Sequence, residues 1–577
     1  MAVLNRLYIT VGILAILVLL AGFLLPPMVD WSGYRDRLET LVESNLGTDV
    51  TIDGEMDFWL LPKPQIRLGK TILGPPSSPL IEIEAIIADL SLLDLLRDRL
   101  NVTNLELRSP IINIDIGKSG EFEIPLSLSE NFNTGRVLIS AIKISDANLR
   151  INDARNLQST QIQGFDGDLN VSGINGPFRL QGSALFGGQK NNIRVSLSAI
   201  SAQNEAQASL FMRADDASYT ISAEGLLQFG PLAKFIGEGS VRVANLTPGE
   251  KQQDRGDSVL TGEVELSGEK LLLTSFELQP DENRVGSRLS GAAVINLGEL
   301  QNFDIVVSGN VVKLAPVDIR HKSDGVPSEL LNIINNLSGI YTPPIPGRLG
   351  MDIGELSVGN LSMRNVRIDA FSDGENWELG GFDAVLPGNS KFSLAGLVTK
   401  SNEGGRFDGK TTVTSPSMGA LAQLWNGATV SSQLFGKTGE ISSNVKLANG
   451  ILTLTNAKLA MDGVAHDFAG LFELSGQRTA LLSARIASVD ANQSDNLISL
   501  LPEFSEGGAF LNNFPGGSVD VSLESAVLFG LDTSLAFLQM DWDEAGIRIN
   551  RLGAKNIGGA QIDFSGNVVG GDDGGQM

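Results

Sequence analysis

The chain has 577 residues, with 43 Lys and Arg against 67 Asp and Glu, and a formal net charge of −24 at pH 7. Such an acidic chain repels phosphate backbones, so nucleic acid is not an expected partner. The absence of cysteine excludes disulfides, thiolate metal sites and a cysteine nucleophile. Glycine is abundant, at 65 residues, which together with few aromatic residues favours many short strands separated by turns.

The first predicted element is an apolar segment, residues 7–25, without a charged residue. As a helix it would span roughly 28 Å, close to the hydrocarbon thickness of a bilayer. Its length and its poor cleavage site favour an uncleaved signal anchor over a cleaved signal peptide. Arg6 favours a cytoplasmic N-terminus (residues 1–6), although Arg35 and Arg37 lie just beyond the other end. The expected anchor residues are Leu7, Ile13, Leu17, Leu20, Phe23 and Leu25.

A short amphipathic helix is predicted at residues 33–46, after Pro26 and Pro27 end the membrane helix. Apolar residues recur there at helical spacing, and Gly47 provides a stop. Packing of its apolar side on the first strands is favoured over binding to a membrane surface, because its polar side carries acidic residues.

Residues 58–74 read FWLLPKPQIRLGKTILG, and their alternation of apolar and polar side chains indicates a strand. Pro62 and Pro64 would remove two backbone donors from the same side of that strand. A side without donors is best left unpaired. The sequence therefore predicts a sheet-edge strand near the membrane, with Pro62 and Pro64 facing away from its paired side.

From residue 48 onward, alternation continues in runs such as 81–87, 112–116 and 193–197. These runs predict a mainly β chain after the N-terminal transmembrane helix, with a few short helices. Alternation alone does not separate one long sheet from two to four β-sandwiches in a row, because both arrangements bury one face of each strand, and the residues by themselves favour the sandwiches. The resemblance described below favours instead the fold class predicted here: a long, curved, mostly antiparallel sheet shaped as a groove. Short helices are expected at residues 90–99, 230–236, 327–337, 417–425 and 495–501.

The chain is expected to divide into four parts after the anchor. The first is an N-terminal region of a short helix and the first strands, residues 28–160. A middle β region (161–340) and a C-terminal β region (341–569) follow. Residues 570–577, GGDDGGQM, are expected to form a flexible acidic tail.

The order of parts in residues 1–150 resembles the N-terminal region of the AsmA-like family. The stretches that carry the resemblance are LGTDVTIDGEMDFWLLPKPQIRLGKTILG and PLIEIEAIIADLSLLDLLRDRLNVTNLELRSPIINI, which follow the anchor and the short helix. Further along the chain the resemblance is only general: long β structure interrupted by glycine residues. It implies a single-pass inner-membrane protein of Gram-negative bacteria with a large periplasmic β region. It also implies a curved sheet with an apolar concave surface and a link to phospholipid movement and outer-membrane assembly.

No catalytic motif is present: the chain has no H-E-x-x-H, G-x-S-x-G or Walker-type sequence. Its two histidines, His321 and His466, are expected to be surface residues. A protein that is not an enzyme and needs no cofactor or metal is therefore expected. An envelope polysaccharide hydrolase remains a minor alternative, because some carboxylate pair among many could act as a dyad.

The favoured function is a membrane-anchored periplasmic groove for phospholipid transfer between inner and outer membrane, contributing to outer-membrane assembly and homeostasis. The alternative is an anchored scaffold or regulator of outer-membrane protein assembly without lipid transport. The expected partners are phospholipid acyl chains, the inner membrane and other envelope proteins. The candidate groove-lining residues are Ile66, Leu68, Ile81, Ile83, Ile87, Ile112, Ile114 and Ile116.

Overall fold

The computed structural model describes residues 2–24, 28–95, 100–123, 137–139, 141–156, 158–172, 175–230, 232–244, 256–281, 287–315, 326–336, 342–399, 405–427, 430–504 and 508–568. The chain forms two compact units. Unit 1 comprises Met1–Arg284 and Val294–Gln301, and unit 2 comprises Val285–Ala293 and Asn302–Met577. The division falls inside the middle β region expected at residues 161–340.

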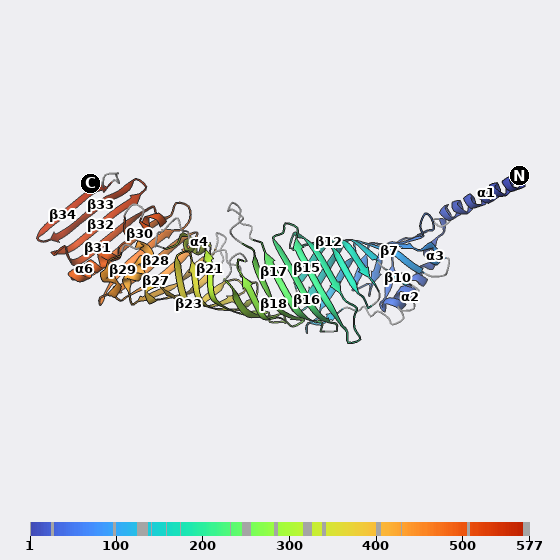
Figure 1. Cartoon of the computed structure of the whole chain (residues 1–577), viewed down its shortest axis with the longest axis horizontal. Coiled ribbons are helices and arrows are strands. Elements are labelled where there is room, and N and C mark those ends of the chain that lie inside the picture. The colour runs from blue at the N-terminus through green and yellow to red at the C-terminus, as the bar shows by residue number, and fades with distance from the viewer. Residues whose placement is uncertain are drawn as a thin grey trace. The chain divides into compact units, whose positions relative to one another are not determined.

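The protein is mainly β, and its strands form a long mixed sheet that is not closed, accompanied by few helices (Figure 1). Most neighbouring strands are antiparallel, as expected. Parallel pairs occur between β7 (Leu100–Arg108) and β11 (Ala141–Asp153) in unit 1, and between β30 (Thr479–Ile486) and β31 (Gly516–Leu528) in unit 2. This pairing favours a long sheet over a row of separate β-sandwiches.

Unit 1 begins with α1 (Ala2–Leu24), which covers most of the expected anchor. Most of its described side chains are exposed, and Ile13, Leu17, Leu20 and Phe23 are each more than half exposed. Leu25 and the side chain of Leu7 lie outside the described residues. In the part of the chain that the structure describes, no helix is long and apolar enough to cross a membrane.

The short helix expected at residues 33–46 is confirmed as α2 (Arg35–Leu46), preceded by η2 (Trp31–Tyr34). Gly47 ends it with a left-handed φ of 66°, a conformation that glycine adopts without strain. Val42 and Leu46 pack on a small core of Val50, Leu73 and Ile83. The prediction that this helix packs on the first strands is therefore confirmed. The first strands are β1 (Val50–Ile52), β2 (Met56–Trp59), β3 (Gln65–Leu68), β4 (Thr71–Leu73), β5 (Ile81–Ile83) and β6 (Ala85–Leu90).

The expected edge strand at Pro62 and Pro64 is wrong. Strand β3 starts after both prolines and is paired on both sides, with β2 and with β6. The prolines lie in the connection between β2 and β3, where an absent N–H costs no ladder hydrogen bond. The carbonyl of Pro64 still accepts from the N–H of Leu90 at 2.7 Å, and Pro64 is buried whereas Pro62 is exposed.

The remainder of unit 1 consists of strands and turns, apart from α3 (Leu92–Leu95). The helix expected at residues 230–236 is wrong, because residues 234–236 instead form ladder pairs with residues 265–267. The further strands are β8 (Ile111–Ile116), β9 (Phe122–Glu123), β10 (Val137–Ile139), β12 (Gln158–Val171), β13 (Phe178–Phe186), β14 (Gln189–Leu197), β15 (Glu205–Ala214), β16 (Tyr219–Gln228), β17 (Lys234–Val243), β18 (Ser258–Ser267) and β19 (Lys270–Gln279). From β11 to β19, each strand pairs antiparallel with the next.

In unit 2, helices separate groups of strands. They are α4 (Ser328–Asn336), α5 (Met418–Asn426), α6 (Ala491–Leu500) and α7 (Ala509–Asn513), with η5 (Pro387–Asn389) and η6 (Ser432–Gly436). Helices α4, α5 and α6 match the helices expected at residues 327–337, 417–425 and 495–501, whereas α7 was not expected. The strands are β21 (Asn302–Ala315), β22 (Pro346–Val358), β23 (Leu361–Asp373), β24 (Trp377–Leu386), β25 (Ser390–Thr399), β26 (Arg406–Ser415), β27 (Gly439–Ala448), β28 (Ile451–Met461), β29 (Val464–Glu473), β30, β31, β32 (Leu531–Asp543), β33 (Gly546–Ile557) and β34 (Ala560–Val568); the division between the units falls within β20 (Leu289–Asn296).

Candidate apolar sites

One face of the unit 1 sheet is apolar across successive strands. Leu169 on β12 stands opposite Leu180 on β13, which stands opposite Val195 on β14, and Leu210 on β15 continues the row. Ala223, two glycines and Phe276 extend it to β19. Because side chains alternate between the two faces of a strand, neighbours at i ± 2 lie on the same face. We call this surface the unit 1 apolar face; it also includes Ile193, Leu197, Met212, Ile221, Val241, Leu260, Val264, Leu266 and Leu278.

The opposite face of the same strands is largely polar, although Phe211, Leu226 and Ile236 also lie on it. Arg179, Ser196, Ser209 and Glu224 occupy successive positions of one row, one residue out of step with the apolar row. The two faces therefore differ sharply in chemistry, as a sheet with one solvated face requires.

No described helix of unit 1 lies beyond Leu95, so the described residues after it contribute only strands and turns. No described helix of unit 1 after Leu95 therefore covers the apolar face. Leu210 and Leu266 on this face are 37% and 43% exposed, values far from those of a sandwich core. Most other members of the face are half-buried, whereas polar-face residues such as Glu224 and Glu238 are exposed.

The sheet of unit 1 curls. The guanidinium of Arg155, in the turn after β11, donates to the carbonyl of Gly268, in the turn between β18 and β19. These turns are many strands apart along the sheet. Gly120, in the turn after β8, approaches the same point so closely that an added Cβ would lie 2.7 Å from the oxygen of Gly268. Curling shields one face without a covering layer, which explains why the apolar face is half-buried and identifies it as the concave one.

The candidate groove residues fall into three groups. Ile66 and Leu68 lie across from Ala88 and Ile86, on the same face as these residues. Ile112 and Ile114 lie beside Leu149 and Ile151 of β11, and Ile81 and Ile116 extend this group at either end. These six residues lie on sheet faces, and Ile81 also packs against the small core beneath α2.

Two candidates do not belong to such a surface. Ile83 is 5% exposed, because it belongs to the small core beneath α2. Ile87 lies on the other face of β6, paired with Arg67 and Glu106. The sequence suggested one continuous strand at 81–87, but the structure bends at Glu84 between β5 and β6, which reverses the alternation.

Unit 2 contains an apolar cavity of about 650 Å³. Its floor is the face of strands β27 to β33, and its cover comes from α5, α6 and α7. Small residues such as Ala484 and Ala536 lie between larger residues on the floor. Their short side chains leave space beneath the helices, and this space is the cavity. Representative lining residues are Leu424, Leu482, Ile486, Leu497, Leu523 and Leu538. Four lining side chains are also exposed, which marks an opening to solvent: Ile498, Leu501, Phe529 and Leu552 are 45%, 47%, 90% and 41% exposed.

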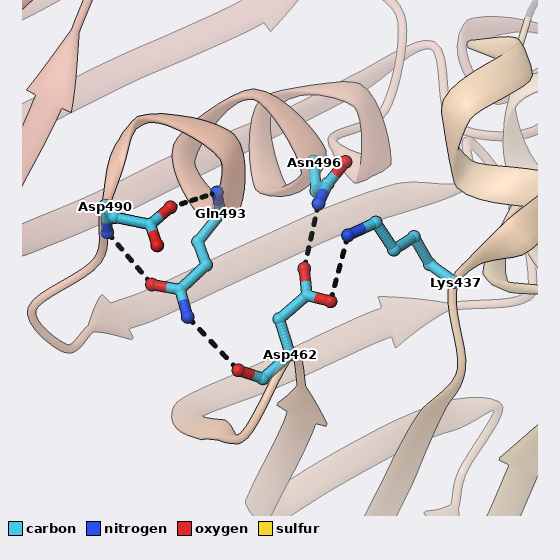
Figure 2. A network of polar contacts seen from close by, with 5 residues as sticks. All are labelled: Lys437, Asp462, Asp490, Gln493 and Asn496. Atoms are coloured by element: carbon cyan, nitrogen blue, oxygen red, sulfur yellow. Dashed lines mark hydrogen bonds and ion pairs between the residues drawn. The ribbon is translucent and has the colours of Figure 1, made fainter.

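Helix α6 is fixed over the cavity by a polar network (Figure 2). Asp490 caps the helix, accepting from the N–H of Gln493 at 2.9 Å, and the Gln493 side chain bonds back to the N–H of Asp490. Asp462, in the turn between β28 and β29, accepts from the Asn496 amide at 2.8 Å and the Lys437 ammonium at 3.1 Å. The carbonyl of Asp462 accepts from the Gln493 amide at 3.1 Å.

His466 on β29 is part of the cavity lining and is only 3% exposed. The expectation that it is a surface residue is wrong. Its position on the strand alternates with exposed Asp467, and it stands opposite Leu459 on the apolar face. Burial lowers the pKa of His466 below its ordinary value, an effect that nearby Asp467 partly offsets. His321 lies outside the described residues.

Among the residues that the structure describes, no cluster of three or more His, Asp or Glu side chains is arranged to hold a metal. Two apolar surfaces stand out among the described residues: the unit 1 apolar face and the unit 2 cavity.

The family model of the AsmA family matches residues 5–261. This chain is an AsmA-like protein. The match covers α1, α2 and the strands of the apolar face as far as β18, and all of it lies in unit 1. The cavity of this AsmA-like protein lies outside the matched residues. No curated protein and no solved structure matches the chain.

Proposed function

We propose that this AsmA-like protein is an envelope protein that carries phospholipid acyl chains along the unit 1 apolar face, between the inner and the outer membrane. The observation that supports this most directly is the row from Leu169 to Phe276, which carries no polar side chain on any strand and is not covered by any described helix of its unit beyond Leu95. Each methylene group moved from water onto such a surface is stabilised by about 0.8 kcal/mol.

The curvature of unit 1 supports the same proposal. A flat apolar sheet in water would invite edge-to-edge or face-to-face association. A concave face instead surrounds a slender apolar ligand and leaves the polar face in water. Acyl chains fit this shape because they need no specific polar partner along their length.

The N-terminal segment is proposed as the membrane anchor on the basis of its sequence, nineteen residues without a charge at positions 7–25. The rest of the chain is then periplasmic. The chain contains no cysteine, so single cysteines can report its topology. A cysteine at exposed Glu544 should react with a membrane-impermeant maleimide added to cells whose outer membrane is permeabilised. A cysteine at Ala2 should react only after lysis, and the reverse pattern would contradict the orientation.

Lipid binding is tested by photocrosslinking at paired positions on the two faces. A photoreactive amino acid at Leu180 should crosslink to phospholipid in cells, whereas the same residue at neighbouring Gln181, on the polar face, should not. Val195→Asp should abolish lipid crosslinking at position 180 by placing a charge on the apolar face. Ser196→Asp, the matched change on the polar face, should leave it intact. Equal crosslinking from both faces, or crosslinking that survives Val195→Asp, would overturn the proposal.

A further inference from the structure

One polar side chain in the lining of the unit 2 cavity, His466, has a ring nitrogen without a described hydrogen-bond partner. Nδ1 of His466 accepts a hydrogen bond from the N–H of Ala487 at 3.2 Å. In the neutral ring the proton is then on Nε2, which makes this nitrogen a donor. Within the described part of the chain, Nε2 has no hydrogen-bond partner. This donor belongs to a side chain that lines the cavity, so it is available to a ligand that enters the cavity.

The other polar donors of the lining are occupied. The Ser494 hydroxyl donates to the carbonyl of Asp490 at 2.7 Å, and the Trp425 indole donates to that of Leu500 at 2.8 Å. The Asn513 amide donates to the carbonyl of Val326 at 2.8 Å. A buried water typically needs about three polar partners, and these other donors of the lining are already used within the protein. A ligand that brings its own acceptor is the better match.

The walls define the rest of that ligand. The lining is almost wholly apolar, and no lysine or arginine contributes to it. A buried phosphate or carboxylate would therefore lack a cationic partner, which disfavours a charged group inside. The volume of about 650 Å³ is within the range of sites for small molecules.

We propose that the unit 2 cavity binds one long acyl chain, with its acyl oxygen accepting a hydrogen bond from Nε2 of His466. The neutral carbonyl of an ester satisfies the donor without placing a charge in the cavity. A free fatty acid supplies the same acceptor chemistry but carries a carboxylate, so it should bind more weakly at neutral pH. The inference goes beyond the proposed function, because it concerns a separate cavity and would stand even if the unit 1 apolar face carried no lipid.

The site is tested with the full chain reconstituted in nanodiscs and three photoreactive probes that share one diazirine-labelled chain: a methyl ester, the free fatty acid and the plain hydrocarbon. Crosslinked peptides are mapped by mass spectrometry, and affinity is measured by competition with unlabelled compound. The ester should label peptides from β30 and β31 and bind about tenfold more tightly than the hydrocarbon, the ratio expected for one buried hydrogen bond. The free acid should bind more weakly than the ester.

Variants separate the hydrogen bond from the cavity itself. His466→Leu should weaken ester binding about tenfold and leave hydrocarbon binding unchanged, whereas His466→Gln, which keeps an amide donor, should retain most of it. Ala484→Leu should prevent all three probes from labelling peptides of the cavity, because the larger side chain fills its floor. Ala469→Leu, on the other face of neighbouring β29, is the matched control and should change nothing. Thermal unfolding confirms that each variant folds.

Three results would overturn the proposal: equal affinity of ester and hydrocarbon for the unaltered protein, no labelling of peptides from the cavity, or full labelling of those peptides in Ala484→Leu. Because the first comparison uses the unaltered chain, it decides the matter even if a variant fails to fold. Val195→Asp should not affect ester binding here, so failure of this site and failure of the unit 1 apolar face remain distinguishable.

Discussion

The indole N–H of Trp425, at the end of α5, donates to the carbonyl of Leu500, at the end of α6, at a distance of 2.8 Å. The next residue along, Asn426, donates to the carbonyl of Leu501 at 2.9 Å. Two adjacent side chains thus satisfy carbonyls that the last turn of α6 cannot use internally. Both helices cover the cavity, so this contact connects two of the three helices that form its cover.

Trp425→Phe should weaken the contact between α5 and α6. The phenyl ring keeps much of the apolar contact but removes the N–H, which should cost about 1 kcal/mol of stability in unit 2. Amide hydrogen exchange should accelerate selectively over residues 491–501. Trp59→Phe, in unit 1, is the matched control and should leave amide exchange over residues 491–501 unchanged. Unaltered exchange at α6 in Trp425→Phe would show that the contact does not hold the helix.

Asp462→Ala should destabilise unit 2 more than an exposed turn substitution normally does. The change removes the acceptor of Asn496, a side chain that is only 3% exposed, and also the partner of Lys437. Leaving a buried amide unsatisfied costs about 1–3 kcal/mol. Denaturant unfolding should show this loss, and Asp462→Asn, which keeps an acceptor oxygen, should recover part of it. A loss of unfolding free energy below a few tenths of a kcal/mol would mean that water replaces the carboxylate as the partner of Asn496.

The stability of unit 2 should fall in mildly acidic solution because of His466. The folded state holds the pKa of this residue below its ordinary value of 6.5, so the unfolded chain takes up the proton first as the pH decreases. The contribution is fully present above 6.5 and is lost as the pH falls from there toward the lowered pKa of the folded state. The difference in unfolding free energy between about pH 7.5 and about pH 5.5 should therefore shrink in His466→Gln. An identical difference in both proteins would contradict this.

Glu238→Lys should stabilise unit 1. Glu224, Glu238 and Glu263 lie directly opposite one another on β16, β17 and β18, and all three are exposed. Like charges in register are unfavourable, and reversing the central one should gain about 0.2–1 kcal/mol per neighbour. The gain should be largest at low ionic strength. Glu544→Lys, the same charge change in an exposed turn, should give a smaller effect, and a stabilisation of equal size would attribute the gain to net charge alone.

The sequence predicted the strands well, because a period of two is visible wherever one face is solvated. Ile193, Val195 and Leu197 are an example, and their side chains do share a face. The bend at Glu84 and the connection at Pro62 and Pro64 were misjudged, because alternation by itself shows neither where a strand ends nor which neighbour it pairs with.

The cavity was not predictable in the same way. Its floor comes from strands that read as ordinary alternating runs, and its cover comes from helices inserted between those strands. Helix α7 is only five residues long and gives almost no periodic signal. His466 follows Ala465 and precedes Asp467, a polar-looking context that suggested the surface. Only the pairing of β29 with β28, which puts His466 opposite Leu459, shows that it faces the apolar side.

The contact of Arg155 with Gly268 has a consequence for how unit 1 comes apart. Each of the strands from β11 to β19 pairs with its immediate neighbours, so their ladder contacts are local and each hairpin could otherwise open by itself, as in a solenoid. The Arg155 contact closes a loop of more than one hundred residues between two of the turns. Opening at β18 and β19 must then also release the turn after β11. We expect unit 1 to unfold cooperatively, with the strands between these turns lost together rather than frayed one hairpin at a time.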